Sequence, residues 1–158
     1  MTIIEATGVV PAPVEAAFGF LCALENHWSV AGRWIEVVSL TPGARGGRVR
    51  IHGPLGLRRT VTTRVESIDP PRCIRGTARV GRTCAQVSWT LWPHETGGAE
   101  VRLAAVVIDA RAVDRALLAA GGARWMGWLF RATLRRLAAT MAVPAAAPAV
   151  PALSSAHA

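Results

Sequence analysis

The sequence contains no lysine and no tyrosine, and only three of its 158 residues are cysteine. Without tyrosine, the phenolic side chain that often serves as a general acid is missing from any site in this chain. Cys22, Cys73 and Cys84 are odd in number and form neither a CxxC pair nor a zinc-ligand spacing. This pattern argues against a disulfide framework or a zinc site and is typical of a reduced, cytoplasmic protein.

Long hydrophobic runs are also scarce. The N-terminal segment MTIIEATGVV has neither a basic region nor a long apolar core, so we expect no secretory signal. The longest uncharged stretch, residues 137–156, is mostly alanine and contains three prolines, so we expect no membrane span. We predict one folded domain at residues 1–142 and a disordered Pro/Ala-rich tail at 143–158.

Established catalytic signatures are missing as well. There is no GxSxG, no HExxH, no phosphate-binding glycine loop and no paired-carboxylate spacing. We therefore expect no metal ion and no cofactor.

The strongest periodic signal lies near the C-terminal end. A helix of about 20 residues, roughly 30 Å long, is predicted from Gly122 onward, after a short helical segment at 112–120. Its predicted buried face comprises Met126, Leu129, Phe130, Thr133, Leu137 and Thr140. Arg124, Arg131 and Arg135 lie on the opposite face, together with Trp128, which is either covered by a loop or part of a contact surface.

The rest of the chain has the alternation of β-strands. A strand is predicted at residues 2–10, followed by short helices at 13–23 and 25–28. Further strands are predicted at residues 34–40, 48–52, 57–68, 74–80, 85–91 and 101–107. This order predicts an α+β fold in which a curved antiparallel sheet of about seven strands wraps around the long helix.

Four segments carry a resemblance to a known family. They are VPAPVEAAF at 10–18, ESIDPPR at 66–72, VSWTLWP at 87–93 with Gly97-Gly98 after it, and the run 125–137. In this order and spacing, over about residues 3–141, the chain resembles the helix-grip fold of the START/Bet v 1-like (SRPBCC) superfamily, in particular its polyketide cyclase/dehydrase branch. The resemblance implies a cavity between sheet and helix that binds a small hydrophobic or aromatic, polyketide-like ligand. It implies a cofactor-free polyketide cyclase or dehydratase, or alternatively a non-catalytic carrier or sensor of a lipid or other apolar metabolite.

Two residues are candidates for catalysis. His27 adjoins Trp28 where the family's cavity mouth would lie, and a neutral imidazole there could act as general acid or base. The alternative is an ordinary histidine at the surface or at a helix end. Arg59 shares strand parity with Val61 and Thr63, which indicates an inward side chain. Its position near the start of the strand equally allows simple exposure to solvent, and a bulge at 53–56 would reverse the parity. An inward arginine must meet a ligand oxygen, a carboxylate or water, and in a cyclase it could stabilise an enolate.

The candidate ligand-binding residues are Trp28, Val61, Thr63, Trp89, Trp125 and Leu129. The two tryptophans at 89 and 125 are either core residues or pocket walls that stack on a flat ligand.

Positive charge is concentrated in one region. Residues 45–82 hold ten arginines against Glu66 and Asp69, whereas the remainder has as many acids as arginines. Alternation with apolar residues places one set on the solvent-facing side of the sheet: Arg48, Arg50, Arg58, Arg64, Arg75 and Arg79. This arginine-rich face is either simply solvated or attracts an acidic partner, for which an acyl carrier protein would fit a cyclase. Nucleic acid is not expected, because no recognition helix or RNA-binding sheet signature is present.

Overall fold

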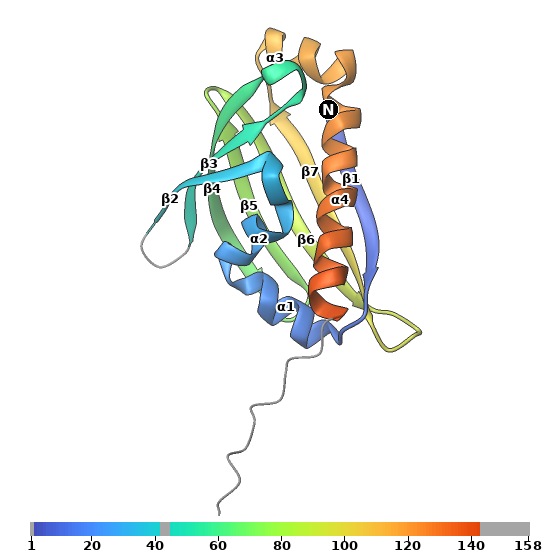
Figure 1. Cartoon of the computed structure of the whole chain (residues 1–158). Coiled ribbons are helices and arrows are strands. Elements are labelled where there is room, and N and C mark those ends of the chain that lie inside the picture. Colours follow the sequence, from blue (N-terminus) through green and yellow to red (C-terminus); the bar gives the residue numbers. More distant parts are fainter. Residues whose placement is uncertain (1, 42–44, 143–158) are drawn as a thin grey trace, which may run out of the picture.

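The computed structural model describes residues 2–41 and 45–142 (Figure 1). The strands are β1 Thr2–Val10, β2 Ile35–Leu40, β3 Gly46–His52, β4 Arg58–Asp69, β5 Cys73–Val80, β6 Thr83–Pro93 and β7 Ala99–Asp109. The helical elements are α1 Val14–Cys22, α2 Leu24–Ala31, η1 Gly32–Trp34, η2 Pro54–Gly56, α3 Ala112–Leu117, η3 Leu118–Gly122 and α4 Ala123–Ala142. The predicted tail at 143–158 lies outside the described residues.

The sheet is antiparallel throughout, with the strand order β1-β7-β6-β5-β4-β3-β2. Strands β2 to β7 lie next to one another in chain order, because few residues separate each strand from the next. The two short helices α1 and α2 carry the chain from β1 at one edge of the sheet to β2 at the other (Figure 1). The predicted α+β fold, with a curved seven-stranded sheet and a long C-terminal helix, is therefore confirmed.

Helix α4 packs against the concave face of the sheet and lies closest to β1 (Figure 1). Leu129 and Leu137 are fully buried, and Leu134 packs so closely on Gly8 that a Cβ there would lie 3.3 Å from the leucine Cβ. The missing side chain of Gly8 thus allows the helix to approach the strand. None of the helices in the described ranges is both long and apolar enough to span a membrane.

One residue of the predicted buried helix face was assigned wrongly. Thr140 is exposed, and its hydroxyl donates a hydrogen bond to the Arg136 carbonyl at 2.8 Å. In its last turns, α4 buries Leu134 and Leu137 and half-buries Met141, which turns Thr140 toward solvent. The arginines predicted on the opposite face, at 124, 131 and 135, are all exposed.

Candidate functional site

The interior between the concave face and α4 is tightly filled at one end. Trp89 and Leu91 of β6 are buried there, next to Ile74, the cross-strand partner of Trp89 on β5. Phe18 and Leu21 of α1 are buried in the same core cluster. This end of the molecule is hydrophobic core and offers a ligand little space.

Toward the other end of the sheet, the inward-facing side chains become small and only half-buried. Strand alternation from Trp89 and Ile74 places Ala85 of β6 and its partner Ala78 of β5 on the concave face. The half-buried residues of this face in β4, β5 and β6 include Thr63, Val65, Gly76, Ala78, Ala85 and Val87. Solvent therefore reaches the concave face in this region, and we call it the half-open interior.

His27 lies in the filled end and packs between two tryptophans. Its ring centroid is 5.4 Å from that of Trp89 and 6.3 Å from that of Trp28, the latter in an edge-to-face arrangement. The side chain is buried, and Nε2 hydrogen-bonds to the carbonyl oxygen of Leu21 at the end of α1. The structure thus brings together three of the predicted site residues, His27, Trp28 and Trp89.

The protonation state of His27 follows from these contacts. A carbonyl oxygen only accepts hydrogen bonds, so Nε2 must carry a proton and the neutral ring has its lone pair on Nδ1. Burial lowers the pKa of His27 below its usual 6.5, against the smaller opposing effects of the Leu21 hydrogen bond and the Glu25 charge. At neutral pH the ring is therefore uncharged and could accept a proton only at Nδ1.

Trp28 adds a polar atom of a different kind. Its indole Nε1 is buried and has no hydrogen-bond partner among the described residues. The rest of the side chain is half-buried. A buried N–H without an acceptor is costly, so this group is a ready donor to any oxygen that comes within reach.

Arg59 faces inward, as strand parity predicts, and it meets a carboxylate. Its Nη2 lies 3.1 Å from Oδ1 of Asp114 in α3, and the other carboxylate oxygen accepts a 2.5 Å hydrogen bond from the Thr83 hydroxyl. The Arg111 backbone N–H also donates to Thr83 Oγ1 at 3.2 Å. These contacts tie the start of β4, the β5–β6 turn and α3 together at the half-open end.

The two predicted catalytic residues therefore lie at different ends of the interior. Arg59 is linked through Asp114 to Thr83 at the start of β6, whereas His27 packs on Trp89 of the same strand. Thr83 and Trp89 are six residues apart, which at about 3.3 Å per strand residue corresponds to roughly 20 Å. A small ligand cannot contact both groups at one reacting atom.

The other predicted ligand-binding residues divide into packed and accessible ones. Val61 is buried opposite Val49 of β3, and Leu129 is 1% exposed. Thr63 is half-buried in the half-open interior, and its hydroxyl makes a long hydrogen bond of 3.4 Å to the Gly47 carbonyl. Trp125 is also half-buried. Of these four residues, Thr63 and Trp125 are therefore the ones that a ligand could reach.

Trp125 belongs to a second aromatic cluster, which joins α4 to the start of β2. Trp34 of η1 packs edge-to-face on Trp125 and on Trp128, with centroid distances of 6.0 and 5.7 Å. The Arg33 guanidinium lies 5.1 Å above the Trp34 ring. Trp128 is thus partly covered by a connecting segment, as one sequence alternative foresaw, although it stays 38% exposed.

Sequence reasoning missed Asp114 and the small inward residues of β5 and β6. Asp114 precedes the apolar Leu118 by four residues, so both lie on one face of a helical segment. This shared face was the available signal that Asp114 points toward the interior. Strand alternation puts Ala78 and Ala85 on the same face as Ile74 and Trp89, and their small size was the available signal for space on that face. No group of three or more potential metal ligands occurs within residues 2–41 and 45–142.

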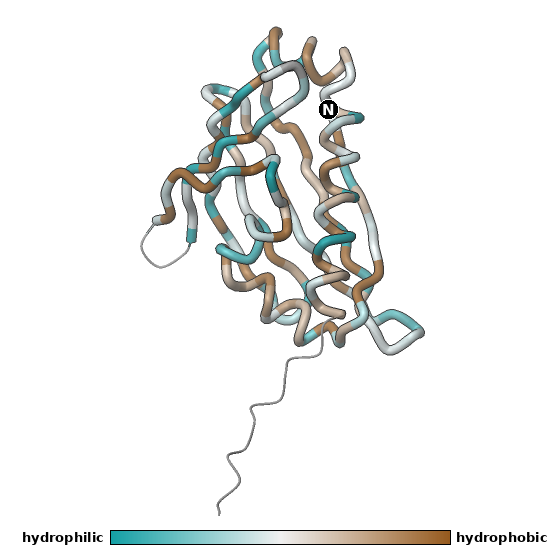
Figure 2. Tube along the Cα trace, viewed as in Figure 1, coloured by the Kyte–Doolittle hydropathy of each residue, from teal (hydrophilic) through white to brown (hydrophobic). Residues whose placement is uncertain are grey.

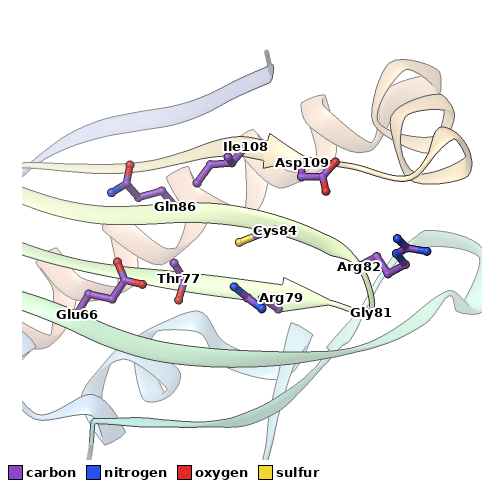
Figure 3. Close-up of a pocket in the computed structure, with 9 residues that line it drawn as sticks. All are labelled: Glu66, Thr77, Arg79, Gly81, Arg82, Cys84, Gln86, Ile108 and Asp109. Carbon is purple, nitrogen blue, oxygen red and sulfur yellow. The ribbon is translucent and has the colours of Figure 1, made fainter.

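The outer, convex face of the sheet has a shallow hollow of its own, with a volume of about 660 Å³. Figure 3 shows its lining: Glu66, Thr77, Arg79, Gly81, Arg82, Cys84, Gln86, Ile108 and Asp109. Charges of both signs line it, so its electrostatics select no ligand class. The six alternating arginines between 48 and 79 also lie on this face, as predicted, and Arg50 pairs with Glu36 at 3.1 Å.

The chain belongs to the family described as polyketide cyclase / dehydrase and lipid transport, whose sequence profile matches residues 1–142. The fold is similar to that of the Zhui aromatase/cyclase from Streptomyces sp. R1128, with a TM-score of 0.64 and 19% identity over 89% of this chain and 93% of that one. It is also similar to protein Ms6760 from Mycobacterium smegmatis, with a TM-score of 0.65 and 16% identity over 91% of this chain and 93% of that one.

Protein CV1439 from Chromobacterium violaceum has a TM-score of 0.61 and 22% identity over 89% of this chain and 98% of its own. At such identities these likenesses show the fold alone. A comparison with curated protein sequences gave no match.

Proposed function

We propose that this protein binds a small hydrophobic or aromatic, polyketide-like ligand in the half-open interior. The observation that carries the proposal is the row of small inward side chains, such as Ala78 and Ala85, that are only half-buried on the concave face. Solvent-accessible apolar surface inside a fold favours an apolar ligand, because ligand binding removes that surface from water.

The polar groups of the interior favour binding without chemistry. Among the described residues, the buried polar side chains are His27, Asp114 and Thr133. Each already has a partner, since Thr133 donates to the Leu129 carbonyl at 2.9 Å and the other two are paired as described above. A carrier or sensor of an apolar metabolite needs no free ionisable group.

A second candidate is a cofactor-free polyketide cyclase or dehydratase. The neutral His27 ring, with its Nδ1 lone pair next to Trp28 and Trp89, favours it. In this proposal Nδ1 takes a proton from a carbon beside a carbonyl group, and the unpartnered Trp28 N–H donates to the oxygen on which charge develops. Arg59, paired with Asp114 at the other end of the interior, takes no part in this step.

Two further parts of the proposal concern a partner protein and the location in the cell. For a cyclase, the arginine-rich outer face would receive an acidic acyl carrier protein through charge complementarity. A cytoplasmic location fits the three free thiols, Cys22, Cys73 and Cys84.

Native mass spectrometry of the protein purified from its own host, followed by denaturing extraction, tests the binding proposal. We expect a bound hydrophobic molecule that denaturation releases. A reproducibly empty protein that also takes up no neutral hydrophobic probe would contradict the proposal.

The extracted molecule then separates the two candidates. If it is a cyclase substrate, its conversion should depend on His27, and the His27→Gln variant should still bind but no longer convert it. Unchanged turnover after alanine substitution at both His27 and Arg59 would end the enzymatic assignment. The acyl carrier protein is tested separately, by binding that weakens when Arg75 and Arg79 are replaced by glutamine.

A further inference from the structure

Helix α3 reverses the usual arrangement of a surface helix. Its acidic residue, Asp114, is buried, whereas Val113 and Leu117 are 57% and 40% exposed. The other exposed apolar residues of α3 and η3 are Ala112, Ala116, Ala119 and Ala120. A surface helix normally presents polar residues to water and buries apolar ones. This exposed apolar face therefore indicates an interaction surface.

The apolar surface continues onto a neighbouring loop. Leu57, directly before β4, is 42% exposed and is followed by Arg58 and Arg59. The ion pair between Arg59 and Asp114 fixes this loop beside α3. Both segments lie at the same end of the molecule, where the α3 segment has hydrophobic colouring (Figures 1 and 2).

Arginines surround these apolar residues. Arg82 on the β5–β6 turn lines a small hollow together with Asp109 and Arg111, which places the turn beside the start of α3. The exposed arginines at this end are Arg58, Arg82, Arg111, Arg115 and Arg124. The acids in the connected segments are Asp109 and the already paired Asp114, so the end carries a clear positive excess.

We propose that this open-end patch, formed by Leu57, Val113, Leu117 and the five exposed arginines, docks on an anionic lipid bilayer. The apolar side chains would enter the interfacial region, and the arginines would pair with phosphate groups while their stems lie along the apolar surface. A bilayer needs no shaped groove, which suits apolar residues carried by one short helix and a neighbouring loop.

Other occupants fit less well. A second copy related by two-fold symmetry would bring the same five arginines face to face, which is electrostatically unfavourable. An acidic protein would satisfy the arginines but would leave unexplained why the exposed face of α3 is apolar. The patch lies at the end where solvent reaches the half-open interior, so docking would bring that end to the membrane.

The docking proposal does not depend on the proposed ligand, because vesicle binding is measured without it. The test uses co-sedimentation of the full chain with vesicles of pure phosphatidylcholine and with vesicles containing phosphatidylglycerol. We expect binding to the anionic vesicles only, weakening as NaCl is raised from about 0.1 to about 0.5 M.

Two double variants examine the patch. Arg111→Gln with Arg115→Gln should weaken binding by about 25-fold, which is about fivefold for each arginine. Val113→Ser with Leu117→Ser should weaken it by about tenfold or more. All four side chains are exposed, so thermal unfolding should change little.

Each variant has a matched control elsewhere on the molecule. Arg131→Gln with Arg135→Gln removes the same charge from the middle of α4, and Val9→Ser with Ile68→Ser removes exposed apolar groups far from the patch. Both controls should bind within about threefold of the native chain.

Three outcomes would overturn the proposal. They are no binding to anionic vesicles, equal weakening by patch and control variants, and a concentration-dependent dimer that the Val113→Ser/Leu117→Ser variant abolishes. If that variant fails to fold, the two arginine variants still decide the question.

Discussion

Arg59 and Asp114 form an ion pair of 3.1 Å that joins the start of β4 to α3, two segments that lie far apart in the sequence. The carboxylate side chain is 11% exposed and the guanidinium 34%. This arginine, a candidate for stabilising an enolate in a cyclase, is therefore neutralised by a carboxylate of the protein itself. Its resting role is to hold α3 and η3 at the half-open end.

Loss of one partner of this pair should be worse than replacement of both. Arg59→Met leaves the Asp114 carboxylate with only Thr83, and we expect the free energy of unfolding to fall by about 1–3 kcal/mol, less than for a fully buried pair. Adding Asp114→Leu should recover part of that loss. Urea denaturation of the two single variants and the double variant measures the coupling, and strictly additive effects would show that the pair contributes nothing.

His27 should make stability depend on pH. Its pKa is lowered in the folded protein, so below pH 6.5 the unfolded chain takes up a proton that the folded chain does not. The free energy of unfolding should therefore fall as the pH decreases from 6.5 to the folded pKa, and this contribution should be constant below it. Urea denaturation at intervals from pH 7.5 to pH 5 follows the effect.

The matched control for that experiment is His27→Gln, which lacks the titrating group. His52, His94 and His157 are retained in both proteins, so the difference between the two pH profiles belongs to His27. Only the slopes are compared, because the variant also loses ring packing on Trp89. Parallel profiles would mean that His27 titrates normally in the folded state.

Filling the half-open interior should block ligand binding without unfolding the protein. Ala78→Leu places a larger side chain on the concave face, and we expect affinity for the neutral fluorescent probe N-phenyl-1-naphthylamine to fall at least about tenfold. Thr77→Leu is the control, because the adjacent residue faces the outer side of the same strand. Equal affinities of the two variants would place the binding site elsewhere.

Trp34 should contribute more to stability than Trp128. Trp34 contacts two tryptophans of α4, and each such aromatic pair is worth about 0.5–1.5 kcal/mol beyond burial. Trp34→Ala should therefore lower the free energy of unfolding by about 1–3 kcal/mol or more. Trp128→Ala loses one pair and a more exposed ring, so a smaller loss is expected in the same urea titration. The reverse order would show that Trp34 does not join η1 to α4.

Local sequence patterns were sufficient for the fold. Alternation along 85–91 places Trp89 and Leu91 inward whatever the neighbouring strand is, because successive strand residues point to opposite faces. The helical period likewise places Leu129 and Leu137 on the buried face of α4 and the arginines on the other. Thr140 was misplaced because the buried stripe drifts toward Met141, and that drift depends on the surface against which α4 packs.

Strand alternation also made an inward Arg59 one of two alternatives, the other being exposure at the strand end. The position of His27 beside Trp28 made it a candidate before any contact was known. Local periodicity says which face of an element a side chain occupies. Local periodicity does not predict which residues the side chain contacts on that face.

The contacts that these side chains make were decided by tertiary structure alone. Asp114 reaches Arg59 across 55 residues of chain, and His27 reaches Trp89 across 62, so no short-range pattern could encode either contact. The roughly 20 Å between these two pairs follows from the length of β6 in the assembled sheet. The sequence by itself determined the elements and their faces, since these depend on backbone periodicity. Only the folded chain decided which charges are neutralised, where the interior stays open and which apolar groups are exposed at its open end, because these depend on contacts between distant segments.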